Sequence, residues 1–496
     1  MNKMKILLIF PRYPNTFWSY KYALKFISKK ASSPPLGLLT VAAMLPESWD
    51  KKLVDMNVVS LKDKDLKWAD YVFISAISIQ KESVKSVIHK CKHQNVKIVA
   101  GGPLFTAGHE EFEEVDHFVL NEAENTLPFL IEDLQNGCAK HIYSSTEFPD
   151  IRNIPVPLYS ILNMKKYALM SIQYSRGCPF DCEFCDITVL YGNKVRTKSK
   201  SQILNELENL YSLNWRGNVF MVDDNFIGNK MVLKKVILPA IITWMKNKKY
   251  PFSFNTEASI NLSDDNELMK LMVRAGFDSV FVGIETPNED SLTECSKVQN
   301  KNRDLIASVK KMQRFGLQVD GGFIVGFDND PPTIFKRQIE FIQKSGIITA
   351  MVGLLNAPRN TKLYKRLVIE NRLIKNISGD NTDFSINFIP KMNYNTLING
   401  YREIIRGIYS QKPFYERAKF FLEEFKRRKK SPFRIQFNHL LAFLKSIWFI
   451  GIYENGRMYY WRLIIWCLFK RPQLFLLAIT YTIYGFHYRK IFWKYL

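Results

Sequence analysis

The segment Arg176-Gly-Cys-Pro-Phe-Asp-Cys-Glu-Phe-Cys-Asp186 carries three cysteines spaced C-x3-C-x2-C and directly follows a predicted strand over residues 168–174. Thiolates are the soft ligands that iron–sulfur clusters require. Cys178, Cys182 and Cys185 can bind three irons of a cubane and leave the fourth iron open. An open iron can bind a substrate, so the spacing predicts a catalytic cluster rather than an electron carrier.

A zinc site, a disulfide and a set of core cysteines each fit the segment less well. A structural zinc site needs a fourth Cys or His ligand at close spacing, and the nearest candidates are Cys138, His141 and Cys295. A disulfide would leave one of the three cysteines unpaired. Buried core cysteines would not alternate with residues such as Pro179 and Asp181. The open cluster is therefore the favoured interpretation.

The cysteine segment opens a region in which predicted strands and helices alternate. The predicted strands cover residues 168–174, 218–222, 252–255, 279–284, 318–325 and 350–354. Helices such as 201–210 and 304–315 lie between them. This pattern predicts a partial (β/α)6 TIM-like barrel, whose chemistry belongs on the loops that follow the strands.

A region nearer the N-terminus repeats the same alternation and predicts a separate, doubly wound α/β domain. Its predicted strands are 6–10, 51–55, 71–76, 97–100 and 117–120, and its predicted helices are 36–44, 82–92 and 124–134. Ligands bind such sheets at the carboxyl ends of the strands. Those ends carry Ser75, Ser78 and the turn Gly101-Gly102-Pro103, although Gly-Gly-Pro is also an ordinary turn.

The length of 496 residues predicts two or three domains. We expect a front domain over 1–145, a proline-containing linker over 146–165, the barrel over 166–390 and a helical C-terminal region over 391–496. The seven cysteines are an odd number and three of them crowd together, which favours a reducing, cytoplasmic setting over a disulfide framework. The apolar run near the N-terminus ends at Pro11 and indicates a buried strand rather than a secretory signal.

The C-terminal region is basic and aromatic. Residues 413–496 hold 16 Lys and Arg against 4 Asp and Glu, and 426–430 is a basic run. Its apolar stretches, 440–453, 458–469 and 474–486, are shorter than the ~20 residues a spanning helix needs. Basic residues beside Trp and Tyr suit a helix lying at a membrane surface. The alternative is a helical domain packed on the barrel. Nucleic-acid binding is not expected, because no recognised motif accompanies the charge.

With Phe184 before its last cysteine, the segment reads C-x3-C-x-aromatic-C and resembles the signature of the radical S-adenosylmethionine (SAM) superfamily. The resemblance implies that the open iron of a 4Fe-4S cluster binds the amino and carboxylate groups of SAM. It also implies an electron from a flavodoxin- or ferredoxin-type partner, which cleaves SAM to a 5′-deoxyadenosyl radical.

Later strand ends resemble the SAM-binding positions of that family. The stretch Met221-Val-Asp-Asp-Asn-Phe226 resembles the form found in cobalamin-associated members, and Gly322-Phe-Ile-Val-Gly326 resembles the adenine-side strand, with Asn329 where Glu is usual. The resemblance implies that SAM is bound by Phe184, Asp223, Asp224, Asn225, Glu257, Glu285, Gly322 and Ile324. An acidic residue at a strand end can also be only a cap or an ion pair. Catalytic residues beyond these are unknown.

The front domain resembles the cobalamin-binding domain of the same enzymes. The resemblance implies that cobalamin is bound by Pro35, Leu36, Gly37, Ser75, Ser78, Gly101, Gly102, Pro103 and Glu122. The motif Asp-x-His-x-x-Gly, which supplies a lower cobalt ligand in many corrinoid proteins, does not occur. The resemblance therefore implies cobalamin without a protein histidine ligand, as in radical methyltransferases. An empty flavodoxin-like domain is the alternative.

Three downstream stretches, 354–361, 378–380 and 387–390, resemble a subgroup that contains hopanoid methylases and tetraether lipid ring synthases. The resemblance implies a lipid or other hydrophobic substrate and peripheral membrane contact through the tail. We therefore expect a cobalamin-dependent radical SAM enzyme that methylates an unactivated carbon. Ring closure between two carbons with the same cofactors is one alternative, and a non-catalytic corrinoid or iron–sulfur sensor is another.

Overall fold

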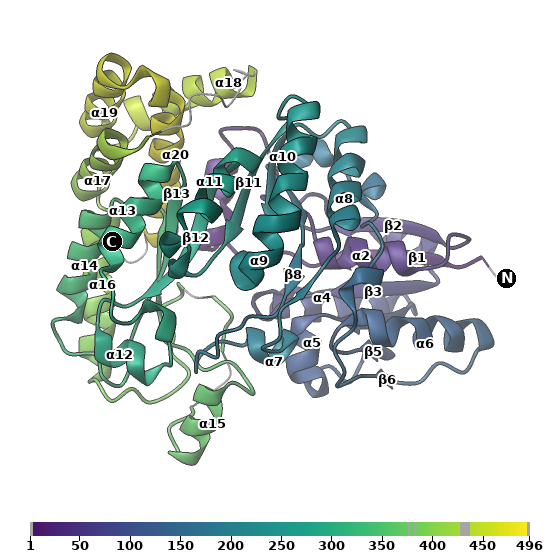
Figure 1. The fold of residues 1–496 in the computed structure, drawn as a ribbon. Helices are drawn as coiled ribbons and strands as arrows, with labels where there is room; N and C mark the ends of the chain where they lie inside the picture. Colours follow the sequence, from purple (N-terminus) through teal and green to yellow (C-terminus); the bar gives the residue numbers. More distant parts are fainter. Residues whose placement is uncertain (1–2, 375–376, 381, 427–436, 494–496) are drawn as a thin grey trace.

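The computed structural model describes residues 3–374, 377–380, 382–426 and 437–493 (Figure 1). A front domain with a parallel sheet lies beside a second, curved parallel sheet, and C-terminal helices cover one side of the second sheet. The basic run predicted as a charge patch lies, apart from Lys426, outside the described residues.

The front sheet has the strand order β2-β1-β3-β4-β5-β6 and is parallel throughout. Its strands are β1 (Lys5–Phe10), β2 (Asp50–Asp55), β3 (Tyr71–Ser75), β4 (Lys97–Gly101), β5 (His117–Val119) and β6 (Ile142–Tyr143). Helices α2 (Leu36–Met44) and α6 (Ala123–Asn136) cover one face, and α3 (Asp63–Trp68), α4 (Lys81–His93) and α5 (Pro103–Gly108) cover the other. Both faces of the strands are therefore buried, and the predicted doubly wound domain is confirmed.

The second sheet has the order β14-β13-β12-β11-β10-β7, again all parallel. Its strands are β7 (Met170–Ile172), β10 (Gly217–Met221), β11 (Phe252–Glu257), β12 (Phe277–Glu285), β13 (Gln318–Val325) and β14 (Ala350–Leu354). Its outer helices are α8 (Lys200–Ser212), α10 (Leu238–Asn247), α11 (Asn266–Ala275), α13 (Leu305–Phe315) and α14 (Ile334–Ser345). Strands β7 and β14 are its two edges, so the predicted six-stranded partial barrel is confirmed.

The first barrel strand is shorter than the sequence predicts. Hydrogen bonding to β10 stops at Ile172, and the chain then enters β8 (Ser175–Arg176), which pairs antiparallel with β9 (Arg196–Thr197). This two-stranded ribbon encloses the cysteine segment and the short helix α7 (Ile187–Tyr191). The cysteines are thus held by a ribbon of their own at the end of the barrel.

The two faces of the barrel strands differ in burial. Residues that face the outer helices, such as Val282 and Phe323, are buried, whereas the alternate residues Glu257, Phe281 and Asp320 are only partly buried. These three are neighbours in register across β11, β12 and β13. The inner face therefore presents both an aromatic ring and acidic groups to the barrel interior.

The C-terminal helices are α15 (Lys362–Ile369), α16 (Tyr394–Tyr409), α17 (Gln411–Glu424), α18 (Phe437–Ser446), the π-helical segment Ile447–Ile452, α19 (Arg457–Lys470) and α20 (Phe475–Phe492). Helix α16 closes the β14 edge, where the hydroxyl of Tyr401 donates to the carbonyl of Val352 at 2.8 Å. Helix α20 meets the N-terminal helix α1 (Lys21–Leu24), and His487 lies 2.9 Å from the carbonyl of Phe17. Among the described residues, no helix combines the length and apolarity needed to cross a membrane.

Candidate active site

The cysteine segment is shaped by the ribbon that carries it. Gly177 has a φ of 86°, and a Cβ on it would lie 2.9 Å from the carbonyl oxygens of Gly192 and Lys194, so only glycine fits there. Cys182 is buried, whereas Cys178 and Cys185 are partly exposed. None of the three forms a disulfide. The loop therefore presents three free thiols at the end of the barrel.

The donor chemistry of this loop fits an iron–sulfur cluster. Burial raises the pKa of all three thiols, so deprotonation has to accompany metal binding. In the described part of the chain, no three His, Cys, Asp or Glu side chains converge on a single metal ion. A cubane does not require such convergence, because its three thiolates bind different irons. Side-chain amides of Asn225 and Gln299 lie 3.8 Å from Cys178 Sγ and Cys182 Sγ, where they can donate to cluster ligands.

Sequence reasoning missed a second segment that lies against the cysteine loop. The backbone N–H of Glu183 donates to the carbonyl of Cys295 at 3.0 Å, and the thiol of Cys295 points to the carbonyl of Leu292 at 3.7 Å. Lys297 follows two residues later. Burial alone would lower the pKa of Lys297, but the carboxylate of Glu285 and the neighbouring Cys182 and Cys185 outweigh burial and raise it. Lys297 is thus a cation beside the cluster loop, with a side chain only 13% exposed.

Glu285, a predicted SAM-binding residue, lies at an irregular point of β12. Its φ is 63°, and the register to β13 shifts between Gly283 and Glu285. Its Oε1 accepts from Lys297 Nζ at 2.6 Å, and Asn300 donates to the carbonyl of Gly283 at 3.0 Å. A non-glycine residue in the left-handed region is strained, and this ion pair holds it in place.

The predicted acidic positions on β10 and β11 form a group of like charges. Burial raises the pKa of Asp223 to about 6, of Asp224 to about 7 and of Glu257 to about 8, and mutual repulsion contributes to the last two. The carboxylate of Asp223 already has partners within the protein. Ser175 Oγ donates to it at 2.6 Å, and the Tyr174 N–H donates to it at 3.2 Å. Within the described residues, Asp224 Oδ2 and Asn255 Oδ1 are buried without a hydrogen-bond partner. These orphaned acceptors fit a ligand with ammonium and hydroxyl donors such as SAM.

The other predicted SAM positions lie around the same opening. Gly322 faces the barrel interior, and a Cβ on it would lie 2.8 Å from the ring of Phe281. Ile324, two residues on, is partly buried. Phe184 packs edge-on against Phe327 with ring centroids 6.2 Å apart. The structure therefore brings the predicted residues of β10–β13 to the strand ends nearest the cysteine loop.

The predicted cobalamin positions gather at the carboxyl edge of the front sheet. Ser75 ends β3, Gly101 ends β4 and Pro103 begins α5. Gly102 has a φ of 92°, and a Cβ on it would lie 2.9 Å from Ser75 Oγ. A side chain here would collide with the end of β3, so this tight turn between β4 and α5 requires glycine. Ser78 begins a short 3-10 helix on the same edge, and the predicted positions Pro35, Leu36 and Gly37 form the start of α2.

This edge of the front domain faces the barrel. Arg359, after β14, donates to the carbonyl of Ala107 at 3.2 Å. Gly379 lies against the backbone of Ser78 and Ile79, where a Cβ would approach to within 2.6 Å. The front domain therefore contacts the barrel through the same edge that the sequence predicts for cobalamin.

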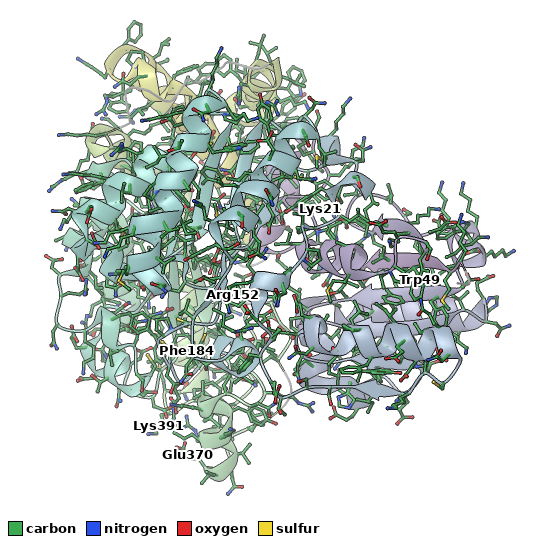
Figure 2. The ribbon with its side chains drawn as sticks, turned by 45° about the vertical axis from the view of Figure 1, so that its right-hand side comes forward. Lys21, Trp49, Arg152, Phe184, Glu370 and Lys391 are labelled. Atoms are coloured by element: carbon green, nitrogen blue, oxygen red, sulfur yellow. The ribbon has the colours of Figure 1, made fainter. Side chains whose placement is uncertain are left out.

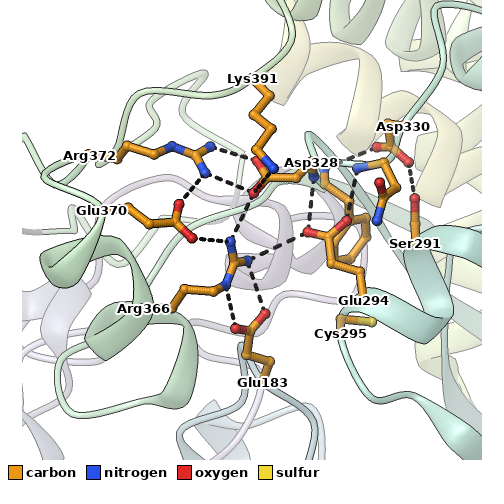
Figure 3. A network of polar contacts seen from close by, with 12 residues as sticks. Glu183, Ser291, Glu294, Cys295, Asp328, Asp330, Arg366, Glu370, Arg372 and Lys391 are labelled. Carbon is orange, nitrogen blue, oxygen red and sulfur yellow. Dashed lines mark hydrogen bonds and ion pairs between the residues drawn. The ribbon is translucent and has the colours of Figure 1, made fainter.

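An ion-pair network secures the cysteine loop from outside (Figure 3). Arg366 on α15 donates to Glu183 at 2.7 Å and to Asp328 at 2.9 Å. Arg372 donates to Asp328 at 2.6 Å and to Glu370 at 2.7 Å. Figure 2 shows Phe184, Glu370 and Lys391 near one another at this end of the molecule. The arginines hold the pKa of Asp328 at about 2, against the effect of burial.

Three family models match successive parts of the chain. They are a B12 binding domain over residues 27–131, the Radical SAM superfamily over 172–354 and a domain of unknown function, DUF4070, over 361–495. An uncharacterized methyltransferase of Synechocystis is 40% identical over 98% of this chain and 91% of its own length. The chain belongs to the B12-binding radical SAM enzymes. This family assignment confirms the resemblance found in the cysteine segment and the front domain.

Two further comparisons agree with this family. The hopanoid C-2 methylase of Rhodopseudomonas palustris is 29% identical over 92% of this chain and 88% of its own length. The fold matches a solved structure of the cobalamin-dependent SAM radical enzyme OxsB with a TM-score of 0.62, over 100% of this chain and 80% of that one, at 14% identity. The second similarity concerns the fold alone.

This radical SAM enzyme uses a 4Fe-4S cluster, SAM and cobalamin, and it is a methyltransferase by family. The residues fit all three groups. Three free thiols suit the cluster, buried acceptors without hydrogen-bond partners suit SAM, and the carboxyl ends of β3 and β4, where an open parallel sheet binds its ligand, suit cobalamin. Which individual side chains contact SAM and cobalamin stays a prediction.

Proposed function

We propose that this enzyme transfers a methyl group to an unactivated carbon of a lipid. The observation that carries the proposal is the contact between the predicted cobalamin edge and the barrel end that holds the cysteines. When bound, the cluster and SAM supply a radical that removes a hydrogen atom from the substrate carbon, and cobalamin supplies the methyl group that replaces it. The two domains together would keep water away from the reacting carbon.

The inner face of the barrel supports an apolar substrate. Trp18 from the N-terminal segment packs edge-on against Phe281, with ring centroids 5.4 Å apart. Both rings are incompletely buried, and Phe220 and Met351 share the inner face. Asp320, in register beside Phe281, adds one acidic group, whose pKa burial raises to about 7. Glu257 flanks Phe281 on its other side. The aromatic rings and Met351 would contact the hydrocarbon part of a substrate, with the acidic side chains beside them.

We also propose that the tail contacts a membrane surface. Helix α19 is apolar on both faces. Its inner residues Leu463 and Ile464 are buried against the protein. Its outer residues Met458, Ile465 and Phe469 are 69%, 50% and 78% exposed. Leu440, Leu444 and Trp448 form a similar exposed stripe on α18 and the π-helical segment. Arg457, Arg462 and Lys470 lie exposed among them. Exposed apolar side chains with basic neighbours suit the headgroup layer, where the lipid substrate would be found.

The substrate is tested by anaerobic reconstitution with iron, sulfide, cobalamin and a reducing partner of the flavodoxin or ferredoxin type, followed by incubation with host lipid extract. We expect S-adenosylhomocysteine, 5′-deoxyadenosine and a lipid heavier by one methylene. A ring-forming reaction with the same cofactors would instead give 5′-deoxyadenosine without S-adenosylhomocysteine. A reconstituted, reduced protein that does not cleave SAM would contradict both reactions and support a sensor.

A further inference from the structure

A buried ion-pair network joins the front domain to the ribbon that carries the cysteines. Arg176, two residues before Cys178, donates to Glu122 at 2.5 Å and to Glu124 at 2.8 Å. Arg196 donates to the same Glu122 at 2.6 and 3.0 Å. The two arginines lie directly opposite each other in the β8–β9 pairing. One carboxylate from the front domain therefore holds both strands of the ribbon.

The network is shielded from solvent. The side chains of Glu122 and Arg176 are 4% and 12% exposed, and that of Arg196 is 15% exposed. Two arginines opposite each other across a ribbon repel, and Glu122 compensates for this repulsion. Buried ion pairs contribute little net stability because desolvation offsets their attraction, but removal of one partner leaves an uncompensated charge. Glu122 is thus suited to fixing geometry more than to adding stability.

On the front domain, the same residues adjoin the predicted cobalamin edge. Glu122 and Glu124 stand at the start of α6, one turn after β5. The preceding residue, Asn121, has a φ of 63°, and its backbone N–H donates to Thr106 Oγ1 on α5 at 2.9 Å. Helix α5 begins directly after Gly102. A few residues therefore connect the glycine turn to the cysteine segment.

We infer that Glu122 is a positioning residue that, through Arg176 and Arg196, sets the spacing between the cobalamin-binding edge and the cluster loop. The sequence resemblance predicts that Glu122 binds cobalamin directly. In the structure both of its carboxylate oxygens accept from the arginines, so we infer instead that it acts through the placement of the front domain. This inference takes one point from the proposed function, namely that the cluster and cobalamin take part in the same reaction. Its consequence is that radical formation and methyl transfer become uncoupled when the network is broken.

The test compares Glu122→Gln with Glu132→Gln, which changes an exposed residue on the same helix α6. In reconstituted holoenzyme with dithionite, we expect Glu122→Gln to retain SAM cleavage to 5′-deoxyadenosine. Its yield of methylated lipid per 5′-deoxyadenosine should fall by on the order of 10- to 100-fold, since misplacement by about 1 Å costs about 100-fold. Glu132→Gln should match the wild type in both measurements.

A second measurement needs neither substrate nor turnover. Pulsed EPR reports the distance between the reduced cluster and cob(II)alamin, and hydrogen exchange of the metal-free protein reports protection of residues 175–197. We expect a broader distance distribution and faster exchange in Glu122→Gln, and partial restoration in Glu122→Asp, which keeps the charge.

Unchanged distance and exchange in a folded Glu122→Gln would overturn the inference. The inference would also be overturned if Glu122→Gln lost SAM cleavage and methylation to the same extent while the EPR distance and the hydrogen exchange stayed unchanged. If the wild type methylates no lipid, the proposed function fails while these two readouts still decide the role of Glu122.

Discussion

The ammonium group of Lys297 lies 2.6 Å from Glu285 Oε1 and 5.9 Å from the centre of the Phe184 ring, between the β12 bulge and the cysteine loop. A positive charge at this place favours negative charge on the cluster ligands. The ion pair with Lys297 also helps to hold Glu285 in its strained left-handed backbone conformation. One side chain thus links the predicted SAM edge of β12 to the cysteine segment.

Replacement of Lys297 by Met should make the reduction potential of the cluster more negative by about 60 mV, the equivalent of about 1.4 kcal/mol of lost electrostatic stabilisation for one electron. Lys297→Arg should restore most of this shift. Potentiometric titration followed by EPR measures the potential. Lys246→Met, at an exposed position of α10, serves as the control and should leave the potential unchanged.

Single Ala substitutions of Cys178, Cys182 or Cys185 should abolish cluster assembly, because two thiolates cannot retain the cubane. Iron and sulfide contents after anaerobic reconstitution measure this effect, and circular dichroism reports that the fold persists. Cys138→Ala and Cys295→Ala should keep full iron content. Loss of iron in Cys295→Ala would mean that the fourth iron has a protein ligand and is not open.

The raised pKa of Glu257, about 8 against an ordinary 4.5, predicts that the metal-free protein loses stability as pH rises between these values. The folded state binds a proton over this interval that the unfolded state has released, so the free energy of unfolding falls with pH. Glu257→Gln removes the titrating group and should raise the melting temperature more at pH 8.5 than at pH 5. Calorimetry at both pH values measures the difference. An equal effect at the two values would contradict the assignment.

Arg366→Met should weaken the outer support of the cysteine loop, because Glu183 and Asp328 lose a shared cation. We expect about 1–3 kcal/mol of lost stability and faster loss of iron to a chelator. Arg366→Lys should be intermediate, since lysine cannot bind both carboxylates in the same fork geometry. Chelator kinetics identical to those of the wild type would show that α15 does not support the loop.

The double substitution Trp448→Glu and Phe469→Glu should reduce binding to anionic liposomes by on the order of 10-fold or more, because two exposed apolar side chains of the tail surface are lost. Co-sedimentation measures binding. SAM cleavage in solution should remain unchanged, since both residues lie on the outer faces of the tail helices. Phe129→Glu, at an exposed apolar position of the front domain, is the matched control.

The cysteine spacing and the alternation of strands and helices determined much of this protein from the sequence alone. Both are local patterns: three thiols within one loop, and periodic burial within one strand or helix. They predicted the cluster loop, the doubly wound front domain and the six-stranded partial barrel, while the end of the first barrel strand was placed too late, because Ser175 leaves the sheet to pair with Thr197.

Only the tertiary structure brought together residues far apart in the chain. Gln299 lies 117 positions from Cys182, and Arg176 lies 54 positions from Glu122, yet each pair is in contact. Cys295, too distant in sequence to be considered a neighbour of the cysteine loop, binds its backbone. Such contacts depend on how barrel loops and domains pack against each other. Spacing along the chain does not determine that packing. The contact of Lys297 with Glu285 beside the cluster loop, and that of Glu122 with the two arginines between the domains, therefore became visible only in the fold.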